Sequence, residues 1–191
     1  MEIKTLTGSL SALGEFELTG PNLRVSDPCY ERNVWCCGVL SNCVVGTWEA
    51  AKSVVDEGAW GHRVEALLVR AESCPSSFED LAALFAEDKE NWFEADFEVG
   101  VDSGQAGFFD DVRYQDEHEF DDWPAPEVDY GSDWYNHCCE ITLKSSDAAG
   151  VFPHGVVSSS GYGDGGYYCL FHRNRDGETD MAIIVFLEEE E

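Results

Sequence analysis

This 191-residue sequence contains few positively charged residues. Lysine and arginine together number 11 against 39 aspartates and glutamates, which gives a formal net charge of −28 at pH 7 and a pI near 4.1. A field of that sign repels nucleic acid and anionic membranes and attracts basic surfaces. We therefore expect no direct nucleic-acid binding and no membrane binding, and we expect a basic protein as partner.

Several signals of familiar protein classes are also missing. No stretch approaches the roughly 18 uninterrupted apolar residues of a membrane span, and the N-terminal residues lack a basic region followed by an apolar run. The sequence contains no P-loop, no dinucleotide fingerprint and no G-x-S-x-G nucleophile elbow. We therefore expect a cytoplasmic protein and lean against an enzyme.

The eight cysteines include no C-x-x-C pair. An even number permits disulfides, but a cytoplasmic chain with a large core predicts reduced, mostly buried thiols. Adjacent cysteines such as Cys36-Cys37 and Cys138-Cys139 point to opposite faces of a strand, so they do not easily hold one metal ion. No metal site is assigned, although zinc binding by His137 and Cys138 stays an open alternative to ordinary packing.

The composition predicts one folded domain over residues 1–191. Hydrophobic residues make up 43% of the chain and aromatic residues 13%, and no proline- or serine-rich linker divides it. Acidic residues gather near 110–133 and again in the C-terminal run 188–191. Pro124 and Pro126 exclude regular helix in the first of these segments. We therefore predict a long exposed acidic loop at 110–133 and a solvated tail at 188–191.

Short alternating runs of β-branched and aromatic residues predict a strand-rich fold. Ser77 and an acidic first turn predict a helix over 78–87, and Asp133 is the expected N-cap of a second helix over 134–141. The wholly apolar run near the C-terminus predicts a central strand over 181–187, buried on both faces. The expected fold class is α+β, a β-rich single domain with a largely antiparallel sheet and one or two packed helices. The other expected strands cover 3–7, 16–19, 22–26, 34–37, 43–55, 63–71, 93–101, 152–159 and 167–172.

Three polar motifs stand at the ends of these strands. They read D-P-C-Y from Asp27, D-S-G-Q-A-G from Asp102, and S-G-Y-G-D-G-G-Y from Ser160. Four glycines within 161–166 indicate a backbone with positive φ or a close approach by another group. In these motifs, and in their order, the sequence resembles an uncharacterised bacterial and phage family, domain of unknown function 4241. The resemblance implies a β-rich domain of bacterial or phage origin and implies no activity.

Loops that gather at one edge of a sheet can form a binding site. Carboxylates in glycine-rich turns suit Ca²⁺ or Mg²⁺, although the sequence requires no cofactor and such aspartates also commonly bond their own backbone. Cys29 could act as a nucleophile with His154 or His172 as base, against the alternative of a buried structural cysteine. The candidate ligand-binding residues are Asp27, Cys29, Tyr30, Asp102, Ser103, Gln105, Asp110, Tyr162, Asp164 and Tyr167.

The acidic loop supplies a second set of candidates, for binding a protein partner: Asp116, Glu117, Glu119, Asp121, Asp122 and Trp123. Three explanations of the charge stay open, namely solubility, a high-salt habitat and mimicry of DNA phosphates by carboxylates. We expect a non-enzymatic acidic protein that engages a basic protein surface, such as a phage or bacterial inhibitor of a nucleic-acid enzyme. The alternative is a small-ligand or metal-binding protein, or an enzyme, that uses the loops of Asp27, Asp102 and Asp164 as one site. The oligomeric state stays open.

Overall fold

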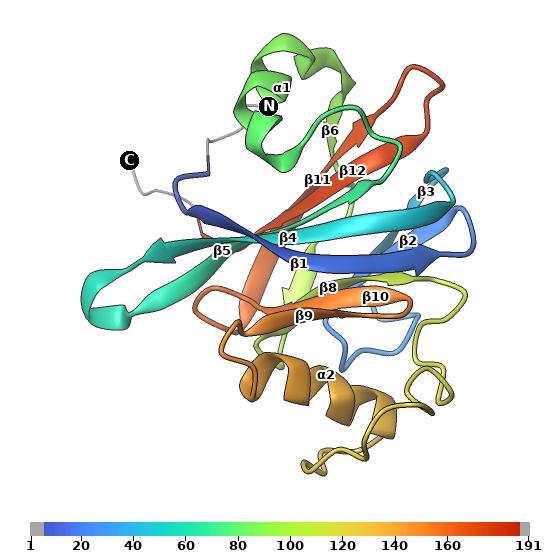
Figure 1. Ribbon diagram of the computed structural model, residues 1–191, viewed down its shortest axis with the longest axis vertical. Coiled ribbons are helices and arrows are strands. Elements are labelled where there is room, and N and C mark those ends of the chain that lie inside the picture. The colour runs from blue at the N-terminus through green and yellow to red at the C-terminus, as the bar shows by residue number, and fades with distance from the viewer. Residues whose placement is uncertain (1–5, 188–191) are drawn as a thin grey trace.

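Two antiparallel sheets packed face to face form the body of the protein, and one α-helix covers the outer side of each sheet (Figure 1). The computed structural model describes residues 6–187. From top to bottom of Figure 1, the layers are α1, the larger sheet, the smaller sheet and α2. The β-rich single domain confirms the predicted fold class, with the single expected sheet replaced by two.

The larger sheet has seven strands in the order β1-β4-β5-β12-β11-β6, and β7 pairs with β11 as well. All of its strand pairs are antiparallel. The strand predicted to be central, β12, lies between β5 and β11. The bounds are β1 (Ser9–Leu18), β4 (Gly46–Asp56), β5 (His62–Ala71), β6 (Trp92–Glu94), β7 (Val99–Val101), β11 (Gly165–Arg173) and β12 (Thr179–Val185).

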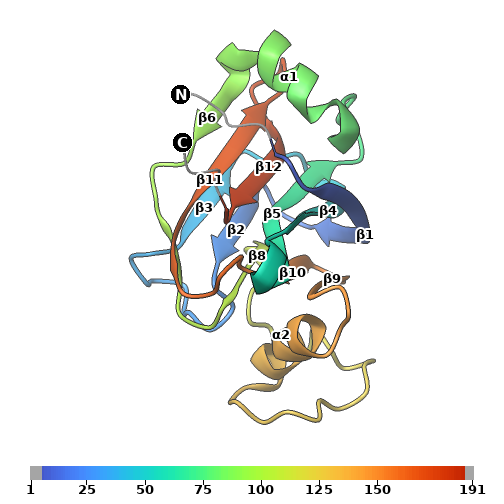
Figure 2. The same ribbon diagram turned by 90° about the vertical axis from the view of Figure 1, so that its left-hand side faces the viewer.

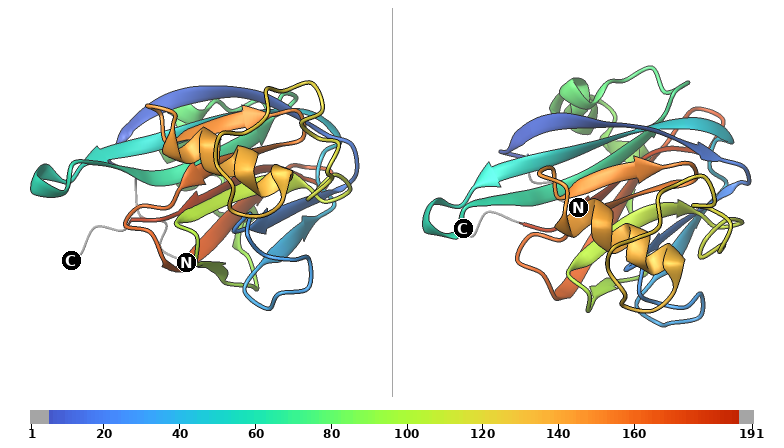
Figure 3. Two further views of the ribbon diagram at one scale, coloured as in Figure 1. Left: turned by 90° about the horizontal axis from the view of Figure 1, so that it is seen from below. Right: turned by 60° about the horizontal axis from the view of Figure 1, so that its bottom comes forward.

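The smaller sheet has five strands in the order β3-β2-β8-β10-β9, again all antiparallel. Seen from below, α2 and the segment 111–132 lie across its outer face (Figure 3). Its strands are β2 (Asn22–Ser26), β3 (Gly38–Ser41), β8 (Gln105–Asp110), β9 (Ala149–Phe152) and β10 (Gly155–Ser159).

Alternation along β12 connects two of the three hydrophobic clusters. Ala182 and Ile184 belong to the cluster between the sheets, whereas Met181, Ile183 and Val185 belong to the cluster beneath α1. Every residue of β12 is buried, because both of its faces are covered. A third cluster fills the space between the smaller sheet and α2, and it includes Phe109, Tyr114, Phe120, Trp134 and Phe152.

Both predicted helices are present with small differences. The helix predicted over 78–87 consists of the 3-10 turn η2 (Phe78–Asp80) followed by α1 (Leu81–Glu87). α2 (Asp133–Leu143) begins at a different cap from the one predicted, because the Ser132 hydroxyl accepts the N–H of Tyr135 at 3.3 Å. Further 3-10 turns are η1 (Gly58–Trp60) and η3 (Lys89–Asn91). No helix within residues 6–187 is long and apolar enough to cross a membrane.

Several predicted strand boundaries are wrong. Residues 34–37 form turns, and β3 begins only at Gly38. The run 93–101 is divided, because β6 and β7 pair with separate parts of β11. Residues 105–110 form β8 instead of a loop. The expected strand 152–159 is divided by a turn at Pro153-His154 into β9 and β10.

The two short strands predicted near the N-terminus, over 3–7 and 16–19, also differ from the structure. Gly14 lies inside β1 at a register shift, with a φ of 130°, so it forms a bulge and does not separate two strands. The strand expected over 3–7 is absent from residues 6 and 7, and its remaining residues lie outside the described range. The predicted tail 188–191 lies outside that range as well.

Candidate functional site

Asp27 is the centre of a buried hydrogen-bond cluster that joins the first two motifs. It directly follows β2, and its side chain is completely buried. One carboxylate oxygen accepts hydrogen bonds from the Cys29 N–H at 2.8 Å and the Ser103 hydroxyl at 2.6 Å. The other oxygen accepts the backbone N–H groups of Asp102 at 2.9 Å and Ser103 at 2.7 Å. These four bonds fix the D-P-C-Y turn against the D-S-G-Q turn.

The third motif packs against the second. The Ser160 N–H donates to the Gly104 carbonyl at 3.1 Å, and a Cβ added at Gly104 would lie 3.9 Å from the Gly163 Cα. The neighbouring Gln105 is buried and accepts the Thr142 hydroxyl at 2.9 Å, which ties the same turn to α2. The structure therefore brings all three motifs together at one end of the smaller sheet.

Asp110, the last residue of β8, is a second buried carboxylate. It accepts the backbone N–H of Thr19 at 2.8 Å and that of Val112 at 2.9 Å, and it also accepts the Thr19 hydroxyl. The expectation that this aspartate stands in a loop is wrong. Its donors come from the residue after β1 and from the start of the acidic segment, so it joins these segments at the end of β8 opposite the motif junction.

The glycine turn 160–166 is held by its own hydrogen bonds. The Tyr167 hydroxyl donates to the Gly163 carbonyl at 2.6 Å, and the Gly163 N–H donates to the Ser160 carbonyl at 2.7 Å. Gly161 and Gly163 have φ values of 54° and 111°, in the left-handed region that favours glycine. The turn is thus a tight corner. The side chains of Asp164 and Tyr162 lie exposed on its outside, as does Asp102 on the adjoining turn.

The carboxylates of Asp27, at the motif junction, and of Asp110, at the opposite end of β8, are both used by protein donors. A cation at Asp27 or Asp110 would have to displace N–H and O–H groups that already occupy the carboxylate oxygens, so neither residue fits a Ca²⁺ or Mg²⁺ site. In the described part of the chain no group of three or more His, Cys, Asp or Glu is placed to hold a metal ion. Zinc binding by His137 and Cys138 is not supported either, because the His137 ring stacks on the Phe120 ring, with 4.3 Å between the ring centres.

Cys29 is exposed, so the alternative of a buried structural cysteine is wrong, but the pairing with a histidine base is not formed either. Partial burial and then the Asp27 carboxylate raise the pKa of its thiol to about 12, so the thiol stays protonated at neutral pH. The two histidines considered as its base contact other carboxylates: His154 Nδ1 lies 2.8 Å from Glu119, and His172 Nδ1 lies 2.6 Å from Asp180. All eight cysteines are free thiols.

The acidic segment 111–132 contains neither helix nor strand, but its first half is anchored. Tyr114 is buried and donates its hydroxyl to the Tyr30 carbonyl at 2.7 Å. Glu119 is buried as well and accepts the His154 N–H at 2.8 Å, while Phe120 packs into the cluster beneath α2. The prediction of an exposed loop is therefore wrong for these residues, because aromatic packing holds this half against the smaller sheet.

The remaining candidates on this segment face solvent to different degrees. Asp116 is partly buried and pairs with Arg113 at 2.9 Å. Trp123 is 38% exposed, and its ring packs edge-on against the Phe120 ring with 5.1 Å between the ring centres. The exposed acidic candidates are Glu117, Asp121 and Asp122.

Two pockets of opposite charge flank the glycine turn. The first, the acidic pocket, has a volume of about 430 Å³ and lies where residues 95–98 separate β6 from β7. Glu94, Asp96 and Glu98 line one wall, and none of them forms an ion pair with any residue in 6–187. A Cβ added at Gly166 would lie 2.7 Å from the Glu98 carboxyl carbon, so the absent side chain makes room for that carboxylate. Tyr167 and Tyr168 line the pocket as well.

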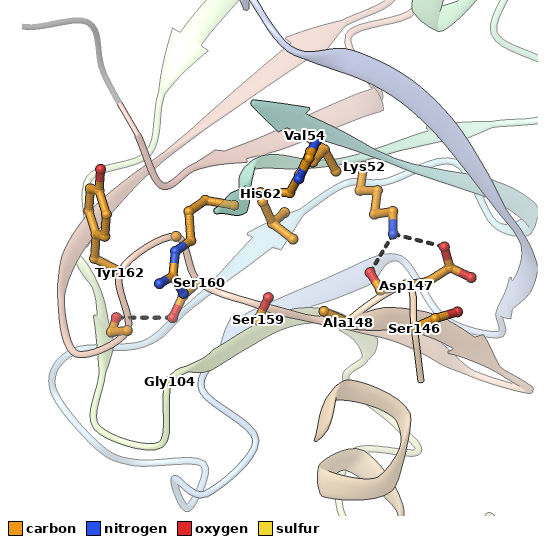
Figure 4. A pocket seen from close by; sticks show the side chains of 14 residues that line it. Lys52, Val54, His62, Gly104, Ser146, Asp147, Ala148, Ser159, Ser160 and Tyr162 are labelled. Carbon is orange, nitrogen blue, oxygen red and sulfur yellow. Dashed lines mark hydrogen bonds and ion pairs between the residues drawn. The ribbon is translucent and has the colours of Figure 1, made fainter. Parts of the chain in front are cut away.

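The second, the basic pocket, has a volume of about 350 Å³ and lies between the β4–β5 hairpin and the glycine turn (Figure 4). Lys52, His62 and Arg63 line it from the hairpin side. Figure 4 shows the Lys52 ammonium bonded to Asp147 at one end of the pocket and Tyr162 at the other. The Arg63 guanidinium lies 5.8 Å from the centre of the Tyr162 ring.

A family model described as "Protein of unknown function (DUF4241)" matches residues 18–184. The chain belongs to this family. No curated protein and no solved structure matches the chain. The matched region contains all three motifs and both pockets, so the junction and the two cavities are parts of the family domain.

Of the predicted site residues, Tyr162 lines the basic pocket and Tyr167 lines the acidic pocket, but the sequence analysis did not identify the charged residues of either pocket. A signal existed for the acidic pocket, because acidic residues at 94, 96 and 98 lie on one face of an extended segment. The basic pocket had no such signal. Its residues come from β4, β5, β10 and two turns, and only the packing of the hairpin over the glycine turn brings them together.

Proposed function

We propose that this DUF4241 protein is a non-enzymatic binding protein that engages a basic surface of another protein, such as that of a nucleic-acid enzyme. The acidic pocket carries the proposal, because it offers three carboxylates that have no cationic partner within the described residues. A cytoplasmic location accords with eight free thiols, which persist in a reducing compartment.

The chemistry of the acidic pocket suits an arginine or lysine side chain. Carboxylates form charge-assisted hydrogen bonds with a guanidinium, and aromatic faces attract cations. Glu94, Asp96 and Glu98 supply the carboxylates, and Tyr167 supplies an aromatic ring with a phenol whose pKa is raised by burial. That phenol stays neutral at physiological pH, so the pocket combines three negative charges with an uncharged aromatic wall.

Phe97 fixes the segment that carries two of these carboxylates. Phe97 contributes to the lining, but its ring packs on Gly38, where an added Cβ would lie only 2.1 Å from a ring carbon. Because Phe97 is fixed in this way, the side chains on either side of it, Asp96 and Glu98, are directed outward and exposed. An acidic rim of this kind steers a basic partner and speeds its association.

The alternative based on Asp27, Asp102 and Asp164 has less support. Asp27 is buried and has protein donors on both oxygens, so it has no acceptor capacity left for a ligand. Asp102 and Asp164 are exposed, and neither lines one of the two pockets.

The test compares two variants that each remove three negative charges. E94Q/D96N/E98Q neutralises the acidic pocket, and E117Q/D121N/D122N neutralises the exposed part of the 111–132 segment. Figure 2 shows β6 near α1 at one end of the molecule and this segment at the other end, below α2. The probe is a fluorescently labelled oligo-arginine peptide, whose affinity is measured by anisotropy at about 0.15 M salt, where the Debye length is about 8 Å.

The pocket variant should bind the peptide at least about tenfold more weakly than the wild type, because loss of hydrogen bonds to a charged group costs about 1.5–3 kcal/mol. The segment variant should lose less than about threefold, as expected for exposed charges that act only through the general field. Equal losses in both variants would mean that net charge alone attracts the peptide. A larger loss in the segment variant would assign recognition to Asp121 and Asp122 and their neighbours.

A further inference from the structure

We infer that the basic pocket is a binding site for a small phosphate monoester. In a chain with a net charge of −28, this pocket is lined by Lys52, Arg63 and His62 and by a single carboxylate, that of Asp147. The Lys52 ammonium forms an ion pair with that carboxylate, with 3.0 Å between Nζ and Oδ1. The positive charge of Arg63 is therefore not cancelled inside the pocket.

The hydrogen-bonding groups of the pocket point to an anion. Arg63 Nε is buried and has no hydrogen-bond partner, and Arg63 forms no ion pair with any residue between 6 and 187. The side chains of His62, Ser146 and Ser159 also line the pocket and have no side-chain hydrogen bond among the described residues. Arg63 can only donate, and the two hydroxyls and the imidazole can each donate as well, so a ligand that supplies acceptor oxygens would satisfy all of these groups.

The spatial origin of these donors favours phosphate over a carboxylate. Arg63 and His62 come from β5, Ser159 from β10 and Ser146 from the turn before β9, so the donors approach from three elements. Figure 4 shows the Ser159 hydroxyl directed into the pocket, below the β4–β5 hairpin. A planar carboxylate presents two oxygens, whereas a phosphate monoester presents three terminal oxygens, so after arginine has bound two oxygens in parallel a phosphate still offers a third to the other donors.

The rim of the pocket fits the organic part of the ligand. Tyr162 is 57% exposed, and its ring meets the Trp60 ring edge-on at 6.4 Å. Trp60 is itself 69% exposed at the tip of the β4–β5 hairpin. Aromatic surface beside a cationic group is suited to an aromatic or similarly flat substituent. The volume of about 350 Å³ lies at the lower end of the range for small-molecule sites, which is roughly 300–1,000 Å³.

The test uses isothermal titration calorimetry with inorganic phosphate, phenyl phosphate and benzoate as probes. Two arginine variants are compared, Arg63→Gln in the pocket and Arg173→Gln as the matched control. Arg173 also lies over an aromatic ring, at 5.2 Å from the centre of Phe93, but it does not line the basic pocket. Both variants remove one positive charge, so they change the overall field equally.

Wild-type protein should bind phenyl phosphate with one-to-one stoichiometry and more tightly than inorganic phosphate or benzoate. Arg63→Gln should weaken this binding by about tenfold or more, and Arg173→Gln by less than about twofold. Ser159→Ala should weaken it by about threefold to tenfold, which provides a second variant with no change of charge. Phenyl phosphate binding that is absent at millimolar concentration, or equal losses in the two arginine variants, would overturn the inference. Tighter binding of benzoate would overturn the choice of phosphate.

Discussion

Replacement of Asp27 by asparagine should destabilise the protein severely. The asparagine oxygen can keep the donors of one carboxylate oxygen, but its NH₂ group then faces the other pair. If the oxygen stays with Cys29 and the Ser103 hydroxyl, the NH₂ group meets the N–H groups of Asp102 and Ser103, which now lie 2.9 and 2.7 Å from the carboxylate. Two hydrogen bonds to a charged group are lost, at about 1.5–3 kcal/mol each, so the expected loss is about 3–6 kcal/mol.

Urea unfolding followed by tryptophan fluorescence measures this loss. With a slope of about 2 kcal/mol/M, the midpoint should fall by about 1.5–3 M. Asp164→Asn is the matched control, because Asp164 is an exposed aspartate of the third motif, and its midpoint should change by less than about 0.3 M. If Asp27→Asn does not fold, Ser103→Ala removes only one of the four bonds and should cost about 1–2 kcal/mol. A loss below about 1 kcal/mol in Asp27→Asn would refute the structural role of this carboxylate and return it to the candidate ligand-binding residues.

Three further predictions concern other parts of the fold. Burial lowers the pKa of His172, but the Asp180 carboxylate outweighs this effect and raises the pKa. The protonated His172 therefore stabilises the fold fully below the unfolded pKa of about 6.5, and this stabilisation is lost as pH rises through the folded pKa. His172→Gln should accordingly lower the free energy of unfolding more at pH 5.5 than at pH 9 in urea titrations. Gly161→Ala should lower the free energy of unfolding by about 1 kcal/mol or more, measured by thermal unfolding, because the φ of 54° and a Leu187 methyl 2.9 Å from the added Cβ are both unfavourable. Gly165→Ala is the control and should cost less, because the nearest atom to its added Cβ lies at 3.5 Å. Native Cys29 should react with iodoacetamide more slowly than an ordinary thiol at pH 7, because its raised pKa leaves less thiolate, and a rate equal to that of free glutathione or faster would contradict this.

The parts of the fold that were predictable are those in which local pattern and burial agree. The apolar run of β12 identified a central strand because both faces of that strand are covered by hydrophobic clusters. β8 was missed for the opposite reason. Its two ends are Gln105 and Asp110, which are buried only because Thr142 and Thr19 supply hydrogen-bond partners. Those partners lie 37 and 91 positions away along the chain, so no local pattern reveals them.

The break between β6 and β7 was unpredictable on similar grounds. The sequence over 93–101 alternates as a single strand would, and its apolar positions are Phe93, Ala95, Phe97, Val99 and Val101. Whether such a run stays paired depends on its neighbour. Here Leu170, Phe171 and His172 pair with β6, while 165–167 at the glycine-rich start of β11 pair with β7. The acidic pocket forms in the gap, so the feature that carries the proposed function depends on a strand pairing that the sequence does not specify locally.

The three motifs and the two pockets have different roles in the domain. The most conspicuous polar residues of the sequence direct their side chains toward protein donors. Asp110 joins Thr19 to one end of β8, whereas at the other end Asp27 and Gln105 hold the motif junction together. The glycine turn that they support then places Gly161 and Tyr162 against the basic pocket and Gly166 and Tyr167 against the acidic pocket. Residues that bind a ligand need acceptor or donor capacity left over after folding, and that capacity remains on the pocket walls and not at the motif junction. A substitution at the junction should therefore lower stability and weaken both proposed binding activities together, whereas a substitution in one pocket wall should weaken one of them and leave stability unchanged.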